Sequence, residues 1–185
     1  GFGFDKKSRQ IMFGKGAGSS DESPLELYYL HGALHFYMDN GELVKITRDK
    51  DTYNDTLLNI ITNSYDRGNF PLYVSEGTWE QKLSVIENNK YLMYCYKALQ
   101  NVSGSLTIYG QSLNKECDMH IINAIKGSKV TNLAYGIYDK ENADEIMYEI
   151  KTMFTGTQIT VDFFDSTNFF QSLEQLQLEM LLENI

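Results

Sequence analysis

The sequence predicts an α/β fold, a mostly parallel sheet with helices on both faces, plus a small β-hairpin. Short apolar runs typical of strands alternate along the second half of the chain with segments whose apolar side chains recur at helical spacing. Strands joined by such helices imply right-handed crossovers and parallel pairing. The hairpin follows from Asp39-Asn40-Gly41, a turn sequence between the apolar runs Leu34 to Met38 and Glu42 to Ile46.

The amino-terminal part gives weaker patterns. Residues 1–23 are rich in Gly, Ser, Lys and Asp, with one apolar run at Ile11-Met12-Phe13, and predict a loop excursion or a small hairpin. A strand is expected at Leu25 to Leu30. This strand leads into the aromatic run from Tyr28 to Tyr37. The run predicts that the strand is buried and that it stops at His31-Gly32.

Helices and strands then alternate to residue 164. A helix is expected over residues 54–66, because its apolar side chains lie at helical spacing and Gly68 supplies a stop. The elements expected after it are a strand at Pro71 to Ser75, helices from Gly77-Thr78 to Asn88 and over Tyr91 to Leu99, a strand at Ser105 to Tyr109, a helix at Asp118 to Lys126, a strand at Asn132 to Tyr138, a helix at Asp144 to Phe154 and a strand at Gln158 to Phe164.

The tail from Phe169 to Leu181 predicts an amphipathic helix, which either caps the sheet or meets a partner, including a second copy of the chain. Residues 24–185 contain no internal repeat and no low-complexity linker, so they predict a single domain.

Composition narrows the function classes. The net charge of −9 and a pI near 4.8 argue against nucleic acid or an anionic membrane as the main partner, because both require a positive surface. No apolar run approaches the length of a membrane span. Cys95 and Cys117 form neither a disulfide framework nor a metal motif, so a cytoplasmic location and no metal are expected.

In open α/β sheets, ligands bind outside the carboxyl ends of the strands, so the residues just after each expected strand are the candidates. His31 stands there with Gly32 behind it, placed like a catalytic base that a ligand can approach; the alternative is a histidine that satisfies a backbone carbonyl. Ser75-Glu76-Gly77-Thr78, Gly110-Gln111-Ser112-Leu113 and Asp139 follow the later strands. Two of these turns place a hydroxyl residue after glycine, which suits sugar hydroxyls or phosphate.

Each remaining candidate has a plainer alternative. Asp118 is either a helix cap or a ligand contact, and Glu76 either a solvated helix start or a ribose ligand. His35 and His120 are expected to be structural. Lys15 to Ser20 has the letters of a phosphate loop, but it precedes a strand instead of following one, so it predicts a flexible loop.

Several short motifs of this sequence occur in the same order along the chain as in a known protein family. They are Leu30-His31-Gly32, Pro71 to Thr78 with Glu80 to Leu83, Tyr91-Leu92, Ile108 to Leu113, Asp118 and His120-Ile121. Over residues 25–138 the chain thereby resembles bacterial sirtuin-like (SIR2-like) proteins of an uncharacterised subfamily. The resemblance implies a Rossmann-like sirtuin domain, of which this chain is the C-terminal portion.

The resemblance also implies a function. His31 matches the sirtuin base that helps to activate a ribose hydroxyl when the nicotinamide bond of NAD is cleaved, and Gly110 and Ser112 match the turn at the adenosine end of NAD. Bacterial sirtuin-like relatives often hydrolyse NAD, frequently in defence against phage. The alternative is a non-catalytic nucleotide-sensing or assembly domain. The predicted nucleotide contacts are Gly32, Ser75, Glu76, Gly77, Thr78, Gly110, Ser112, Leu113 and Asp118.

The chain departs from the family pattern in two places. The family's Gly-Ala-Gly phosphate loop belongs well upstream of the histidine, and Gly16-Ala17-Gly18 stands too close to it. We therefore expect the upstream part of the domain to precede this chain, which by itself is expected to be inactive. The cysteine tetrad of the protein deacylases is absent, which argues against deacylation and a structural metal.

Overall fold

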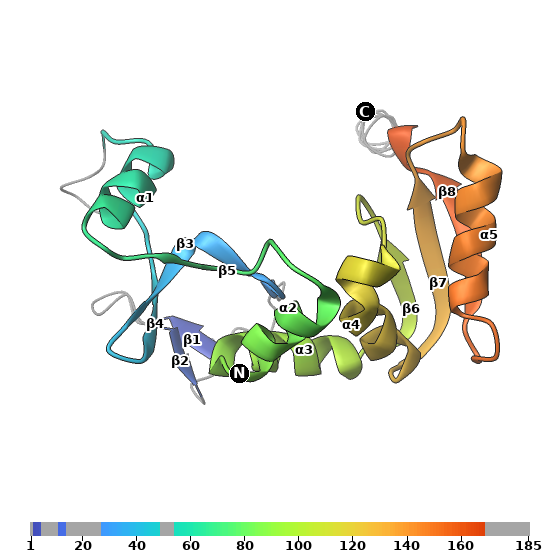
Figure 1. Cartoon of the computed structure of the whole chain (residues 1–185), viewed down its shortest axis with the longest axis horizontal. Helices are drawn as coiled ribbons and strands as arrows, with labels where there is room; N and C mark the ends of the chain where they lie inside the picture. The colour runs from blue at the N-terminus through green and yellow to red at the C-terminus, as the bar shows by residue number, and fades with distance from the viewer. Residues whose placement is uncertain (1, 5–10, 14–26, 49–53, 169–185) are drawn as a thin grey trace, which may run out of the picture. The chain divides into compact units, whose positions relative to one another are not determined.

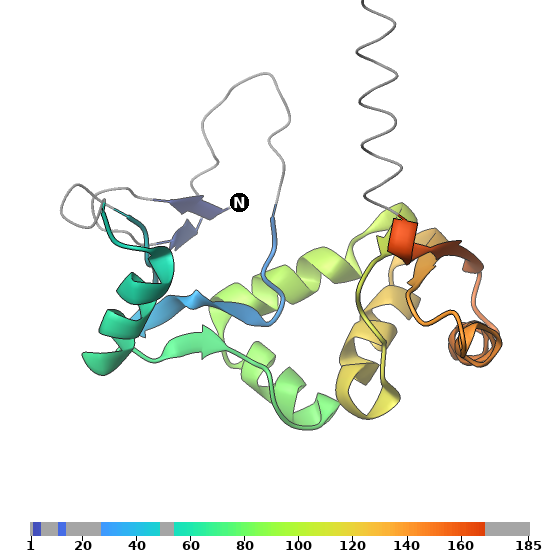
Figure 2. The same ribbon diagram turned by 90° about the horizontal axis from the view of Figure 1, so that it is seen from above.

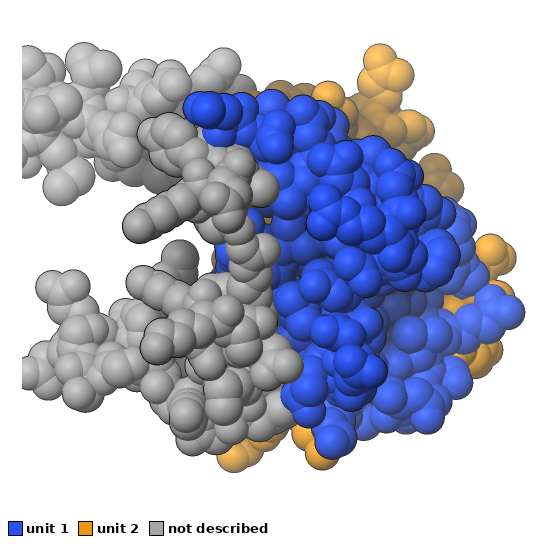
Figure 3. Space-filling view, turned by 90° about the vertical axis from the view of Figure 1, so that its left-hand side faces the viewer, with its two compact units in different colours: residues 1–77, 81–96 blue, residues 78–80, 97–185 orange. Residues whose placement is uncertain are grey.

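The computed structural model describes residues 2–4, 11–13, 27–48 and 54–168 and shows a mixed α/β chain (Figure 1). The chain divides into two compact units (Figure 3). Unit 1 comprises Gly1–Gly77 and Gln81–Tyr96, and unit 2 comprises Thr78–Glu80 and Lys97–Ile185.

Unit 1 contains a three-stranded antiparallel sheet. Its strands are β3 (Gly32–Asp39), β4 (Glu42–Lys45) and β5 (Pro71–Tyr73), in the order β4-β3-β5. The turn between β3 and β4 has positive φ at both Asn40 and Gly41, 48° and 84°, as a two-residue hairpin turn requires. The predicted hairpin is therefore confirmed.

A second, smaller hairpin stands at the amino terminus. Strand β1 (Phe2–Phe4) pairs antiparallel with β2 (Ile11–Phe13), with Phe2 opposite Phe13. This pairing confirms the hairpin alternative for residues 1–23.

The strand expected at Leu25 to Leu30 is wrong over its described residues, 27–30. Residues 27–29 have no regular structure, Leu30 and His31 form a turn, and β3 begins at Gly32, so the strand starts where it was expected to stop. The Gly32 N–H donates to the Tyr29 carbonyl oxygen at 2.9 Å. The backbone reason lies at Gly32, whose φ is +75° and whose missing Cβ would stand 2.0 Å from the Leu72 carbonyl oxygen of β5.

Three helices complete unit 1 and its connection to unit 2: α1 (Leu57–Asp66), α2 (Trp79–Glu87) and α3 (Lys90–Gln100). All three confirm predicted helices. The Thr56 side chain caps α1 by accepting from the Asn59 N–H. In the core, the fully buried Phe36 ring meets the rings of Tyr29 and Tyr91 edge-on, at centroid distances of 5.1 and 5.3 Å.

Unit 2 is a parallel β-α-β-α-β arrangement. Strands β6 (Ser103–Ile108), β7 (Lys129–Ile137) and β8 (Thr160–Asp165) pair in that order, joined by α4 (Lys115–Lys126) and α5 (Ala143–Met153). The α/β class and the parallel pairing are thus confirmed for this unit. A mostly parallel sheet that includes the earlier strands is wrong, because β3 and β5 pair antiparallel in a sheet of their own.

The two helices of unit 2 cover the same face of the sheet (Figure 2). Both crossovers step in one direction, from β6 to β7 and from β7 to β8, and right-handed connections then place both helices on one side. Leu133, Tyr135 and Ile137 of β7 are buried, whereas Asn132 is exposed. The predicted helices on both faces are therefore not found within the described part of unit 2, whose second face presents exposed Ser105, Thr107, Asn132, Thr160 and Asp162.

Two predictions lie outside the described residues: the tail helix from Phe169 to Leu181 and the loop from Lys15 to Ser20. Within the part of the chain that the structure describes, no helix is long and apolar enough to cross a membrane.

Candidate functional site

The predicted site residues divide between the two units. Unit 1 holds His31, Gly32, Ser75, Glu76 and Gly77, and unit 2 holds Thr78, Gly110, Ser112, Leu113 and Asp118. The expectation that ligands bind at the carboxyl ends of parallel strands does not apply to unit 1, because His31 precedes its strand and β5 is antiparallel to β3. The expectation applies in unit 2, where the β6–α4 loop follows a strand of the parallel sheet.

His31 is half-buried, and its carbonyl oxygen accepts the Val74 N–H at 2.8 Å. Packing alone accounts for the glycine beside it, since any Cβ at position 32 would collide with the Leu72 carbonyl. Gly77 has a similar requirement: its φ is +100°, and a Cβ there would stand 2.5 Å from the Gln81 Oε1 atom. The exposed loop from Ser75 to Thr78 connects β5 to α2, as expected.

The loop from Tyr109 to Asn114 joins β6 to α4 and has an unusual backbone at two positions. Gly110 has φ +72° with no heavy atom within 4 Å of a Cβ, so conformation and not crowding requires glycine there. Leu113 has φ +54° although it is not glycine, and its side chain is fully buried. The left-handed conformation costs an L-residue roughly 1–2 kcal/mol, which burial of the leucine side chain offsets.

Asp118 holds the same loop from beneath. Its carboxylate is buried and accepts from the Gln111 Nε2 atom at 2.8 Å and from the Asn114 N–H at 3.2 Å. The Tyr135 hydroxyl donates to the Gln111 carbonyl oxygen at 2.8 Å, and burial raises the pKa of Tyr135, which keeps this donor protonated. The loop is therefore fixed by both α4 and β7 before any ligand arrives.

The helix-cap alternative for Asp118 is wrong. Helix α4 begins at Lys115, and its cap is Asn114, whose Oδ1 atom accepts from the N–H groups of Glu116 and Cys117 at 2.8 and 3.3 Å. The first turn of α4 also carries the carboxylates of Glu116 and Asp118. A capped helix start with two negative charges favours hydroxyl groups over phosphate as ligands.

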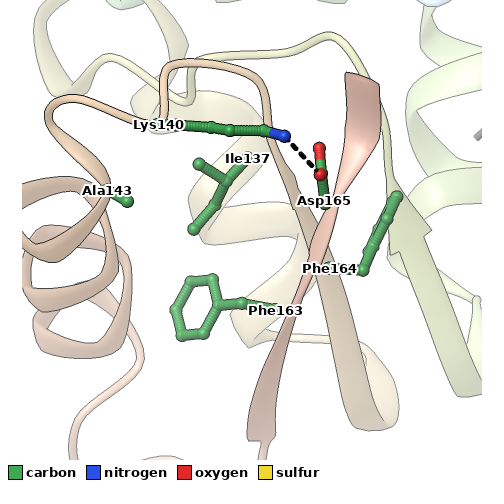
Figure 4. Close-up of a pocket in the computed structure, with 6 residues that line it drawn as sticks. All are labelled: Ile137, Lys140, Ala143, Phe163, Phe164 and Asp165. Atoms are coloured by element: carbon green, nitrogen blue, oxygen red, sulfur yellow. Dashed lines mark ion pairs between the residues drawn. The ribbon is translucent and has the colours of Figure 1, made fainter. Parts of the chain in front are cut away.

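A pocket of about 280 Å³ lies at the carboxyl ends of β7 and β8 (Figure 4). It is lined by Ile137, Lys140, Ala143, Phe163, Phe164 and Asp165. The Phe163 ring points toward α5 and the Phe164 ring to the opposite side of β8 (Figure 4). Four of the six residues are apolar, so the pocket suits a flat ring with a polar group at its edge.

The charged residues in the lining of this pocket form an ion pair, and a second cation lies close by, with the Lys151 Nζ atom 5.5 Å from the centroid of the Phe163 ring. The Lys140 Nζ atom lies 2.6 Å from Asp165 Oδ2, and Asp165 Oδ1 accepts the N–H and hydroxyl of Thr167 at 2.9 and 2.5 Å. The hydrogen bond from Lys140, followed by those from Thr167, lowers the pKa of Asp165 to about 2. Asp144 and Glu145 stand in the first turn of α5.

We expect Lys140→Met to raise the pKa of the Asp165 carboxyl, while the Thr167 hydrogen bonds keep it below the ordinary value of 3.8. In the unmodified chain the lowered pKa contributes stability that is present above the unfolded value and lost as the pH falls from 3.8 toward 2. Carboxyl NMR titration measures the shift, with Lys126→Met as a matched control. An unchanged Asp165 pKa in Lys140→Met would contradict the ion pair.

Sequence reasoning missed the pocket and named only Asp139 at this edge. The Asp139 Oδ1 atom accepts the N–H groups of Glu141 and Asn142, and its pKa is lowered chiefly by hydrogen bonds from Asn142, so it shapes the β7–α5 loop. A signal was present nonetheless. Lys140 follows Asp139 directly, and Asp165 directly follows the predicted strand, so both stand at carboxyl strand ends.

The remaining histidines are packed against other side chains. His120 is fully buried in α4, and the His35 ring packs against the rings of Tyr29 and Phe36. Cys95 and Cys117 are free thiols. Among the residues that the structure describes, no group of three or more His, Cys, Asp and Glu side chains could hold a metal ion.

Comparison with known proteins gives one match. A family model described as "Domain of unknown function (DUF4917)" matches residues 6–169, which is most of the chain. No curated protein and no solved structure matches.

Proposed function

We propose that this chain, which belongs to the DUF4917 family, binds the adenosine half of NAD through unit 2 and has a Rossmann-like, sirtuin-related fold. One observation carries the proposal: a preorganised loop and an apolar pocket both lie at the carboxyl ends of strands in a parallel β-α-β-α-β unit. Nucleotide ligands bind at this edge of open α/β sheets.

The chemistry of this edge supports adenosine over a bare phosphate. The turn at Gly110 and Ser112 offers backbone N–H groups and a hydroxyl to ribose, and the position beside Gly110 is open. The apolar walls beside Phe163 suit an adenine ring. Carboxylates at the starts of α4 and α5 can accept hydrogen bonds from hydroxyl or amino groups, which suits the adenosine moiety more than the phosphates.

The catalytic half of the proposal rests on the sirtuin resemblance. Neutral His31 accepts a proton from a ribose hydroxyl or from water, water replaces nicotinamide at the ribose carbon, and the products are ADP-ribose, nicotinamide and a proton. His31 lies in unit 1, whereas the binding residues lie in unit 2. Because binding is carried by unit 2 residues, a non-catalytic nucleotide sensor is the second candidate function.

Calorimetric titration of the full chain with adenosine, AMP and NAD tests the binding proposal. We expect saturable binding of adenosine and NAD, and no binding of inorganic phosphate. Ala143→Leu fills the pocket without removing a side chain from it and should abolish adenosine binding. Phe163→Ala removes one apolar wall and should weaken binding about tenfold.

Phe70→Ala is the matched control, because Phe70 is an exposed phenylalanine in unit 1 and its loss should leave binding unchanged. Undiminished adenosine binding in a folded Ala143→Leu protein would overturn the assignment of this pocket. An absence of binding in the unmodified chain would favour a structural interaction module.

A further inference from the structure

A second pocket, of about 270 Å³, lies within unit 1 and is independent of the proposed NAD site. It is bounded by the β3–β4 hairpin, by α1 and by the residues that follow α1. Two cationic residues are among those that line it, Lys45 at the end of β4 and Arg67 directly after α1. Asp55 is the one carboxylate in its described lining.

The polar groups contributed by α1 stand on a fixed backbone. The Ser64 carbonyl oxygen accepts the N–H groups of Arg67 and Asn69 at 3.2 and 3.1 Å, and the Asn69 Nδ2 atom donates to the Ser64 hydroxyl at 3.2 Å. Gly68 supplies the positive φ, 90°, that this turn requires. The helix end therefore fixes the backbone of Arg67 and Asn69, and the side chain of Asn69, at the pocket.

The helix that forms one wall is weakly packed. None of the residues of α1 is buried, and Leu58 and Tyr65 are 68% and 51% exposed. Ile60 faces the pocket together with Tyr37 and Val44 of the hairpin. A ligand in this space would contact both walls and add the packing that α1 lacks.

We propose that this pocket binds the phosphate monoester of a small polyol, with Arg67 and Lys45 on the phosphate and Asp55 and Asn63 on the hydroxyl groups. The guanidinium fork of arginine matches phosphate geometry, and a second cation beside it neutralises the dianion. A single carboxylate among amide and hydroxyl groups suits neutral hydroxyl donors. The volume fits a small metabolite.

Glycerol 3-phosphate is the probe, titrated into the full chain by calorimetry, with glycerol, inorganic phosphate and succinate as comparison ligands. We expect glycerol 3-phosphate to bind more tightly than any of the three. Arg67→Gln should weaken binding by about tenfold or more, as loss of a charge-assisted hydrogen bond does. Arg67 is exposed, so circular dichroism should show an unchanged fold.

His35 gives a second measurement. Burial, and after it the charge of Lys45, lowers the pKa of His35. A phosphate on Lys45 screens that charge, so glycerol 3-phosphate should raise the His35 pKa in an NMR titration, and Lys45→Gln should remove this response. Binding elsewhere on the chain would leave His35 unchanged and would overturn the assignment.

Lys90→Gln removes one positive charge from unit 1 away from the pocket lining and should bind the probe as the unmodified chain does. If Lys90→Gln weakened glycerol 3-phosphate binding as much as Arg67→Gln does, the effect would come from net charge alone. That result would overturn the proposed site. Succinate or inorganic phosphate binding as tightly as glycerol 3-phosphate would overturn the ligand class. Ala143→Leu separates this proposal from the NAD proposal, because it should leave glycerol 3-phosphate binding intact.

Discussion

We expect His31→Ala to lower the rate of nicotinamide release from NAD by roughly 10²- to 10⁴-fold, the usual contribution of a general base. The protein is incubated with NAD, and the released nicotinamide is measured by chromatography. The loss should fall on kcat and leave KM nearly unchanged, because the proposed adenosine contacts lie in unit 2 and His31 lies in unit 1.

His35→Gln is the matched control, since His35 lies on β3, which follows His31, packs against aromatic rings and has no proposed catalytic role. Its nicotinamide release should equal that of the unmodified protein. Release at an undiminished rate in His31→Ala would show that His31 is not the base. Saturable NAD binding with no nicotinamide release in the unmodified protein would favour the sensor and reject the enzyme.

Local patterns predicted most of the regular structure. The helices expected over residues 54–66 and Tyr91 to Leu99 and the strand expected at Asn132 to Tyr138 match α1, α3 and β7 to within three residues at either end. These elements depend on side-chain periodicity and caps, which are properties of the segment itself. Parallel pairing in unit 2 followed from the helices between its strands.

Prediction was wrong where a distant segment decides the backbone. The aromatic run from Tyr28 onward is apolar enough for a strand throughout, yet the strand begins only at Gly32, beside the Leu72 carbonyl of β5. The contact joins residues forty positions apart, and nothing near His31 encodes it. Local sequence patterns could not predict the antiparallel pairing of β3 with β5 for the same reason.

The sequence predicted where the candidate loop lies in the chain, but it did not predict the hydrogen bonds within that loop. Gly110 to Leu113 follow a strand and precede a helix, which marked them as candidates. The function of Asp118 depends on bonds to Gln111 and Asn114, which require the loop to fold back over α4. No sequence spacing specifies that geometry, so the sequence favoured a helix cap at Asp118.

Truncation of Leu113 should cost the protein much stability. Its side chain is fully buried beneath the β6–α4 loop, so we expect Leu113→Ala to lower the free energy of unfolding by about 3 kcal/mol. Chemical denaturation measures this loss. Adenosine binding should weaken as well, because the buried leucine holds the loop that carries Gly110 and Ser112.

Leu133→Ala is the matched control, a fully buried leucine in β7 that is outside this loop. It should cost similar stability and leave adenosine binding intact in the folded protein. Glycine distinguishes the two sites further: Leu113→Gly should be at least as stable as Leu113→Ala, because φ at this position is +54°, whereas Leu133→Gly should be less stable than Leu133→Ala. The same ranking at both positions would show that the left-handed backbone at Leu113 does not shape the loop.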